Sequence, residues 1–176
     1  MSKTKWVLDP THSELGFKIR HLMISNVTGK FKEFDASAET EGDDFSTAHL
    51  KANVKVETID TNNKDRDAHL RNADFFEVES YPEMQFESTG VEKVDDDTFN
   101  IHGNLTIKDT TKPVKLVSEY NGIVKDPYGN TKAGFSLTGK INRKDWGINY
   151  NAALETGGVM LGDELKIQGE VQLVKQ

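Results

Sequence analysis

The sequence contains no cysteine. This absence excludes a disulfide framework, thiolate metal sites and thiol nucleophiles. No apolar run approaches the roughly 18 to 20 residues that a helix needs to cross a bilayer, so contact with lipid would have to use a pocket or a surface. Positive charge is not in excess either, because 22 basic and 29 acidic residues give a formal net charge of -7 at pH 7. A field of this sign repels phosphate backbones, so nucleic acid is not an expected partner.

The chain has 176 residues, of which 35% are hydrophobic. This length and composition suit one domain with one sizeable core, and we expect that domain to span residues 1–176. Residues 1–6 run directly into charged, strand-like sequence and contain no apolar segment of the secretory type. The sequence as written therefore predicts a cytoplasmic protein.

Apolar residues alternate with polar ones along most of the chain. Leu15, Phe17 and Ile19 fall on one face of a predicted strand, and Lys18 and Arg20 fall on the other. The same two-residue period recurs at residues 50–56, 84–88, 99–107, 114–120, 135–141 and 165–173, with further candidates at 6–8 and 29–34. Turn-forming clusters lie at residues 41–44, 95–97, 109–113, 126–130 and 155–158. The pattern predicts about eight to nine antiparallel strands, each with one buried and one wet face.

A sheet of amphipathic strands can bury its apolar face by closing on itself, which also removes exposed edges. We therefore predict an all-β fold, an antiparallel barrel. Strands of about ten residues would make it roughly 25 Å tall, a shape that suits an elongated ligand. Gly103, Gly139 and Gly169 lie in mid-strand on the inward face. They either allow the barrel to bend or leave space for a ligand.

Residues 60–76 form the one long segment without alternation. Thr61 or Asp60 could cap a short helix on which Arg66 and His69 share a face. That face could hold an anionic or polar head group, or it could brace the helix on the barrel rim by hydrogen bonds and salt bridges. The aromatic pair Phe75 and Phe76 that follows is placed to plug or gate one end of the barrel.

The five histidines do not have the spacing of metal ligands on one strand or helix face, so no metal is expected. His49 and His102 fall on outward-facing positions, whereas His21 shares parity with Phe17 and Ile19 and is predicted to point into the barrel near its mouth. No nucleophile elbow, phosphate-binding glycine loop or paired-carboxylate motif is present. No catalytic residue and no cofactor are predicted.

Several distinctive blocks of sequence follow one another along the chain. They begin with residues 9–13, 15–17, 20–22 and 29–34, and the most distinctive is 60–76 with Tyr81, Pro82 and Phe86. They continue through residues 103–107, 111–114, 143–148 and 162–165. In order and spacing these blocks resemble the YceI-like family of bacterial proteins. Ala36 stands where the family commonly has glycine, and Trp146 replaces a more usual phenylalanine, adding an indole donor that needs a partner if buried.

The resemblance implies an extended, eight-stranded, lipocalin-like barrel with one or two short helices, commonly a homodimer. It also implies an apolar cavity for amphipathic chains such as polyisoprenoids, isoprenoid quinones or fatty-acid derivatives. On this basis we expect a noncatalytic lipid carrier or sequestering protein without stable membrane insertion. The residues expected at the ligand are Phe17, Ile19, His21, Phe31, Arg66, His69, Phe75, Phe76, Phe86, Ile101, Leu105, Leu116, Phe135, Leu137 and Trp146.

Two alternatives stay open at the level of sequence. The first is an enzyme that acts on a bound isoprenoid or lipid, with His21 or His69 as acid or base. The second is a barrel filled by its own side chains, whose outer surface or dimer face binds a protein partner. A barrel interior without a cavity would favour the second alternative.

Overall fold

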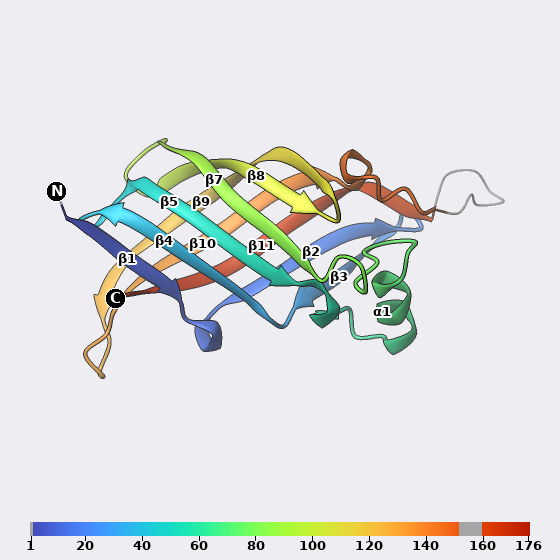
Figure 1. The fold of residues 1–176 in the computed structure, drawn as a ribbon, viewed down its shortest axis with the longest axis horizontal. Coiled ribbons are helices and arrows are strands. Elements are labelled where there is room, and N and C mark those ends of the chain that lie inside the picture. Colours follow the sequence, from blue (N-terminus) through green and yellow to red (C-terminus); the bar gives the residue numbers. More distant parts are fainter. Residues whose placement is uncertain (1, 152–159) are drawn as a thin grey trace.

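The computed structural model describes residues 2–151 and 160–176. Eight strands close into an antiparallel barrel in the ring order β1, β4, β5, β7, β8, β9, β10, β11 (Figure 1). Their bounds are Lys3–Leu8 (β1), Phe34–Glu41 (β4), Asp44–Lys55 (β5), Glu83–Lys93 (β7), Thr98–Ile107 (β8), Thr110–Lys125 (β9), Thr131–Asn142 (β10) and Leu161–Lys175 (β11). The predicted eight-stranded antiparallel barrel is confirmed. The turn predicted at residues 155–158 lies outside the described residues.

The barrel closes along β11, which has two neighbours on one side. Its C-terminal part pairs with β1, where Trp6 lies opposite Lys175. Its N-terminal part pairs with β2 (Glu14–His21), from Glu14 opposite Glu170 to His21 opposite Leu161. The 3-10 helix η1 (Pro10–His12) separates β1 from β2 and lets both strands use the same partner. β11 is thus the seam of the barrel.

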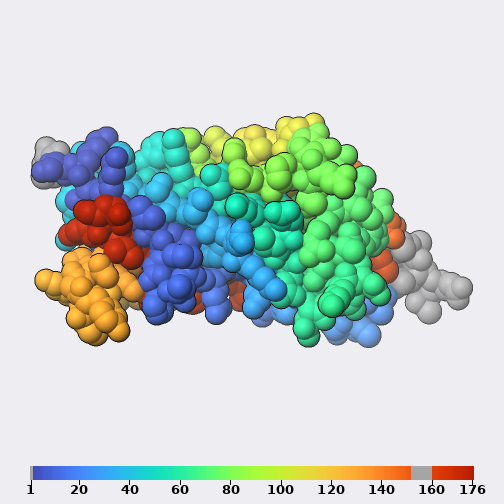
Figure 2. All heavy atoms as spheres, turned by 60° about the horizontal axis from the view of Figure 1, so that its bottom comes forward, coloured from blue at the N-terminus to red at the C-terminus, as the bar shows by residue number. Residues whose placement is uncertain are grey.

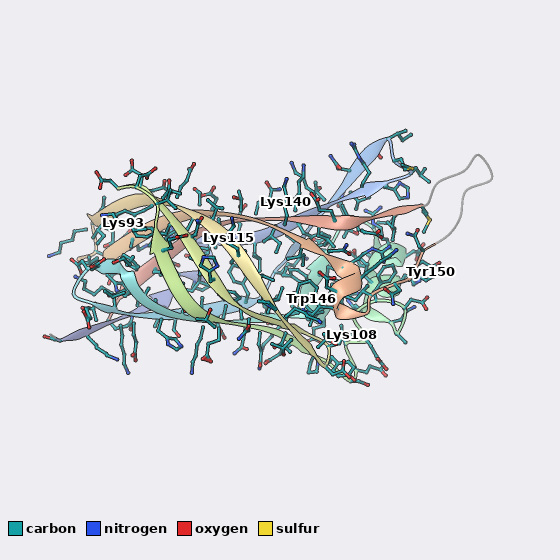
Figure 3. The ribbon with its side chains drawn as sticks, turned by 90° about the horizontal axis from the view of Figure 1, so that it is seen from above. Lys93, Lys108, Lys115, Lys140, Trp146 and Tyr150 are labelled. Atoms are coloured by element: carbon teal, nitrogen blue, oxygen red, sulfur yellow. The ribbon has the colours of Figure 1, made fainter. Side chains whose placement is uncertain are left out.

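A hairpin extends the sheet beyond this ring. β2 pairs with β3 (Ser25–Phe31), and β3 pairs briefly with β6 (Ile59–Asp60). The β2–β3 hairpin projects from the end of the barrel that carries α1 (Figures 1 and 3). The alternation predicted one strand at residues 29–34, but the chain breaks at Lys32 and Glu33, where β3 ends and β4 begins. Because of this break, the first part of the predicted strand belongs to the hairpin and the last residue begins a strand of the ring.

The predicted polar helix is present as α1 (Lys64–Arg71). Its N-cap is Asn63, whose side chain accepts a hydrogen bond of 3.0 Å from the backbone N–H of Arg66, so the predicted caps Thr61 and Asp60 were wrong. Thr61 instead donates its backbone N–H to the buried carboxylate of Asp67 at 2.9 Å. In the space-filling view, α1 and the segment after it form a continuous green surface over one end of the barrel (Figure 2). Two further 3-10 turns are η2 (Val56–Thr58) and η3 (Arg143–Trp146).

The core consists of two clusters along the barrel. The cluster nearer α1 contains Phe17, Phe31, Val54, Val56, Ile59, Phe75, Met84, Ile107, Trp146 and Ile148. The other contains Trp6, Leu8, Ala38, Phe45, Phe99, Ala133, Phe135 and Leu173. Each cluster collects inward-facing residues from several strands, as alternation predicts. An apolar cavity lies between the two clusters and is lined by residues of both.

The mid-strand glycine Gly103 accommodates a neighbouring ring. A Cβ added at this position would lie 2.4 Å from a ring carbon of Phe86, closer than van der Waals contact allows. A Cβ at Gly139 would lie 2.7 Å from Leu116. At both positions the missing side chain makes room for another residue of the barrel, so neither glycine by itself provides space for a ligand.

Candidate ligand cavity

A cavity of about 250 Å³ lies inside the barrel. All eight strands of the ring contribute to its lining, which reaches from Leu8 and Phe135 in one core cluster to Phe31 and Ile107 in the other. Its volume is slightly below the roughly 300 Å³ at which small-molecule pockets usually begin. Because this volume is distributed along the barrel, the cavity is narrow. Its shape suits a chain better than a compact ligand.

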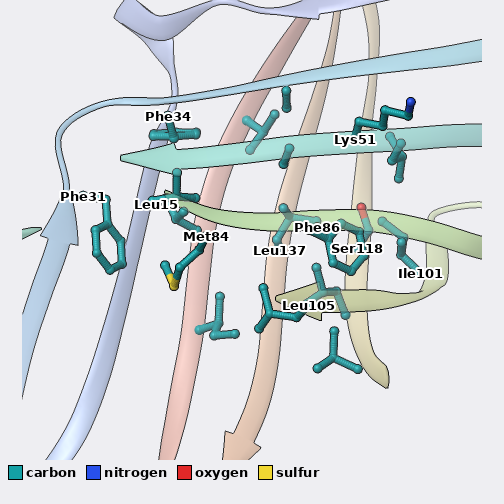
Figure 4. A pocket seen from close by; sticks show the side chains of 18 of the residues that line it. Leu15, Phe31, Phe34, Lys51, Met84, Phe86, Ile101, Leu105, Ser118 and Leu137 are labelled. Atoms are coloured by element: carbon teal, nitrogen blue, oxygen red, sulfur yellow. The ribbon is translucent and has the colours of Figure 1, made fainter. Parts of the chain in front are cut away.

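The wall of the cavity is almost entirely apolar. Figure 4 shows Phe86, Ile101, Leu105 and Leu137 gathered around the open space, whereas the ammonium of Lys51 points away from it. Two buried polar side chains, Ser118 and Arg143, are also among the lining residues. Such a wall favours hydrocarbon and offers few hydrogen bonds to a polar group.

Nine of the fifteen residues predicted from the sequence line this cavity. They come from six strands and from the segment after α1, and they are Phe17, Phe31, Phe76, Phe86, Ile101, Leu105, Leu116, Phe135 and Leu137. Seven of them, all except Phe31 and Phe76, come from segments whose two-residue periodicity separates inward from outward positions. Phe31 and Phe76 were expected at the ligand on the basis of the family resemblance. The contact of all nine residues with a ligand stays a prediction.

The other six predicted residues lie elsewhere. Ile19 and His21 belong to the part of β2 that continues into the projecting hairpin, where the inward face of the strand no longer meets the cavity. Phe75 is buried beside α1. Trp146 is 4% exposed and donates its indole N–H to the backbone carbonyl of Leu105 at 2.9 Å. Phe75 and Trp146 thus pack the core behind the cavity wall.

Arg66 and His69 are the last two of the six. Arg66 is exposed, and its guanidinium donates to both the hydroxyl and the backbone carbonyl of Thr61. His69 Nε2 lies 2.8 Å from Oδ2 of Asp74, and its ring packs edge-on against Phe75 and Tyr150. These contacts hold α1 and the following loop on the barrel. They leave neither side chain in the cavity wall.

Sequence reasoning missed Arg143 as a cavity residue. Its side chain is 3% exposed, and it donates from Nε to Gly162 and from Nη1 to Ile148 and Tyr150, at 2.8 to 3.0 Å from their carbonyl oxygens. Its Nη2 lies 3.9 Å from Oδ1 of Asp163, beyond hydrogen-bonding distance. Burial lowers the pKa of Arg143, although the group stays charged at neutral pH. Arg143 therefore fastens the chain after η3 to the start of β11.

Ser118 is a polar group on the inward face of β9, within the segment 114–120 for which alternation predicted a strand. It is 1% exposed, and its hydroxyl has no hydrogen-bond partner among the described residues. Two-residue alternation predicts the face on which this position lies but does not predict whether its hydroxyl finds a partner. A buried hydroxyl without a partner lowers stability by about 1 to 3 kcal/mol. It is a local weakness in an otherwise apolar wall.

Groups of three or more His, Asp or Glu side chains that could hold a metal ion do not occur in the described ranges 2–151 and 160–176. Within the same ranges, none of the helices has the length and hydropathy required to span a bilayer.

Solved structures with the same architecture include the BcnA protein of Burkholderia cenocepacia, with a TM-score of 0.81, 18% identity, and coverage of 94% of this chain and 98% of that one. A polyisoprenoid binding domain from Saccharophagus degradans aligns with a TM-score of 0.68 and 12% identity, over 97% and 98% of the two chains. At these identities the similarity establishes the fold alone.

Closer relatives establish more than the fold. The YceI protein of Campylobacter jejuni is 34% identical, with a TM-score of 0.78 and coverage of 90% of this chain and 91% of that one. A UPF0312 protein of Staphylococcus aureus strain N315 is 40% identical over 170 residues, which is 96% of each chain. The model of the YceI-like domain matches residues 6–173. The chain belongs to the YceI-like domain family.

Proposed function

We propose that this protein binds one elongated lipid in its barrel and carries or sequesters it without chemical change. The ligand would be a polyisoprenoid, an isoprenoid quinone or a fatty-acid derivative. The observation that carries the proposal is the narrow apolar cavity between the two core clusters. A barrel filled by its own side chains has less support, because this interior space is open.

The energetics favour a chain-like ligand. Burial of hydrocarbon is favourable by roughly 25 cal/mol per Å², so a long chain could bind tightly through its length alone. Apolar walls discriminate poorly between near-isosteres, and we expect loose specificity for chain type. The polyisoprenoid binding domain of S. degradans, which has the same fold, is consistent with a ligand of this class.

The head group of such a ligand has few partners inside. We propose that it stays at the end of the barrel near α1, close to Phe31 and Phe76. Direct contact with Arg66 or His69 would require these side chains to leave Thr61 and Asp74. A bracing role for both residues therefore has more support than a head-group role.

The enzyme alternative has less support than the carrier. His21 and His69 do not contribute to the cavity lining, and His69 is engaged with Asp74. A general acid or base has to come within hydrogen-bonding reach of the reacting atom. The homodimer and the cytoplasmic location stay predictions.

The proposal can be tested by native mass spectrometry of the protein as purified, followed by thermal shift on addition of an isoprenoid quinone. We expect a co-bound lipid of several hundred daltons and a raised melting temperature. Leu137→Trp would fill the cavity and abolish both signals, because Leu137 lines the cavity. Val124→Trp places the same ring on an exposed position and serves as the control. An apo mass together with no thermal shift would contradict the proposal.

A further inference from the structure

The tip of the β2–β3 hairpin carries three consecutive apolar side chains. Leu22, Met23 and Ile24 are 39%, 61% and 81% exposed. The other large hydrophobic residues that are exposed within the described ranges are Val7, Val94, Val124 and Tyr128, and no two of them are consecutive in the sequence. Single exposed apolar residues are common on soluble proteins, whereas a contiguous group at a projecting tip indicates a surface that contacts another apolar phase.

The conformation of the tip does not favour these residues. Leu22 and Met23 have φ angles of 53° and 63°, and the N–H of Ile24 donates to the carbonyl of His21 at 3.3 Å. Two central residues with positive φ are typical of a type I′ turn, for which Asn-Gly is strongly preferred. Leucine and methionine adopt this conformation at a cost in free energy. Local folding therefore does not explain why apolar side chains occupy the tip.

The hairpin is also basic within an acidic protein. Residues 15–32 contain Lys18, Arg20, Lys30 and Lys32 and no Asp or Glu, whereas the whole chain has a net charge of -7. Lys32 lies 3.5 Å from Asp60, but no carboxylate of the described residues lies within 4.0 Å of the other three cations.

Beside Asp60 on β6, which lies opposite Lys30, the neighbouring strand β11 brings two further acidic residues to the hairpin. β11 pairs with β2 and carries Asp163 and Glu164 at the same end of the sheet. Asp163 is engaged with Lys144 at 3.4 Å and is near Arg143. The hairpin itself thus retains an excess of positive charge that is not neutralised by ion pairs.

We propose that the β2–β3 hairpin docks on an anionic lipid bilayer, with Leu22, Met23 and Ile24 in the head-group region and the cations of the hairpin facing anionic lipids. A surface segment that combines basic residues with exposed apolar ones binds membranes in this way. The net negative charge of the rest of the protein is screened beyond about 10 Å at 0.1 M ionic strength. Arg20, two residues before Leu22, is the hairpin cation closest to the tip and contributes most of the local attraction, whereas Lys18, Lys30 and Lys32 lie farther along the hairpin.

Docking in this orientation would place the α1 end of the barrel toward the bilayer, because the hairpin projects from that end (Figures 1 and 3). Phe31 and Phe76, which line the cavity at this end, would face the source of lipid. The idea that docking serves to load or unload a lipid chain rests on the proposed function. The docking itself does not depend on that function.

Co-sedimentation with vesicles tests the proposal. One set of vesicles contains equal parts of phosphatidylglycerol and phosphatidylcholine, and the other contains phosphatidylcholine alone. We expect the unmodified protein to bind the anionic vesicles, with binding weakened at high salt. The double variant Leu22→Asn/Met23→Gly should lose about tenfold or more in vesicle affinity because apolar burial at the tip is removed. The matched control, Val94→Thr/Val124→Thr, removes exposed apolar side chains elsewhere and should bind like the unmodified protein.

The melting temperature of the tip variant shows whether a loss of vesicle binding is caused by misfolding. Asn-Gly suits a type I′ turn, so the variant should melt at the same or a higher temperature than the unmodified protein. Equal vesicle binding by the variant, or no binding by the unmodified protein, would overturn docking. Self-association that the tip variant abolishes, without vesicle binding, would assign the tip to a second copy instead. Native mass spectrometry of the tip variant measures lipid in the cavity separately, so failure of docking is distinguishable from failure of the proposed function.

Discussion

The ammonium nitrogen of Lys132 lies 2.7 Å from Oδ2 of Asp9, which joins β10 to the turn after β1. The two side chains are only 15% and 14% exposed, and Nδ1 of His12 lies 2.9 Å from the same carboxylate oxygen. The hydrogen bond from Lys132 is the main reason why the pKa of Asp9 lies well below its usual value, and Asp9 in turn raises the pKa of Lys132. This contact fastens the seam of the barrel at the end opposite α1.

Asp9→Asn should lower the free energy of unfolding by about 2 kcal/mol at pH 7, because it removes a charge-assisted hydrogen bond. The folded pKa of Asp9 is depressed, so its contribution is fully present above the unfolded pKa of about 3.9 and decreases as the pH falls toward the folded value. Urea unfolding at pH 7 and pH 3 should therefore give a smaller difference between variant and unmodified protein at pH 3. Glu79→Gln, at an exposed position, is the control. A difference that is independent of pH would contradict this account.

Ser118→Ala should raise the free energy of unfolding by about 1 kcal/mol, because it removes a buried hydroxyl without a partner. The affinity for an apolar chain should stay the same or increase, since the cavity wall becomes uniformly apolar. Chemical denaturation of the lipid-free protein measures the first effect, and titration with an isoprenoid quinone measures the second. A loss of stability would mean that the hydroxyl is satisfied in solution by a bound water molecule.

Trp146→Phe should lower the free energy of unfolding by about 1 kcal/mol. The substitution keeps an aromatic ring but removes the donor that bonds to the carbonyl of Leu105. Thermal and urea unfolding would measure the loss. Because Trp146 lies behind the cavity wall, lipid affinity should change little. An unchanged stability would indicate that the carbonyl of Leu105 finds another donor.

Arg143→Lys should destabilise the protein by about 2 to 3 kcal/mol. Lysine has no planar fork and cannot donate at once to the three carbonyls that Arg143 reaches. Lys144→Arg, at a half-exposed neighbouring position, provides a control that makes the reverse exchange of the same two residue types. Unfolding curves for both variants test the expectation. A lysine variant as stable as the unmodified protein would show that fastening the chain after η3 matters little.

His69→Ala should lower stability by about 1 kcal/mol without changing the affinity for a lipid chain. The side chain contacts Asp74, Phe75 and Tyr150, and none of its atoms belongs to the cavity wall. Thermal unfolding and lipid titration of the same variant separate the two effects. A large loss of affinity with little loss of stability would favour the head-group role instead.

Periodicity predicted the barrel and most of its cavity wall because both follow from the same rule. Side chains two residues apart share a face, so Ile101 and Leu105 could be assigned to the interior before their strand partners were known. The rule failed at His21 for a physical reason. Parity specifies a face of the strand, but β2 extends past the closed ring, and beyond that point its inner face no longer borders an enclosed interior.

Polar residues were predicted less well than apolar ones. Arg143 was not recognised as a buried residue, because arginine is almost never fully buried unless its charge is paired or hydrogen-bonded. Its carbonyl acceptors lie up to 19 positions away in the sequence, so the local pattern did not reveal them. Arg66 and His69 were correctly placed on one short helix, yet their partners Thr61 and Asp74 depend on how the flanking loops fold back. Sequence periodicity does not encode such contacts.

The seam formed by β11 has a consequence for synthesis of the protein on the ribosome. Until residues 161–175 have emerged, β10 is paired on one side only, and β1 and β2 each have one unpaired edge. Unpaired edges and an open apolar interior are features that promote aggregation of nascent chains. Closure of this barrel is therefore a late event that follows translation of nearly the whole domain. A chain truncated before β11 should depend on chaperones to stay monomeric.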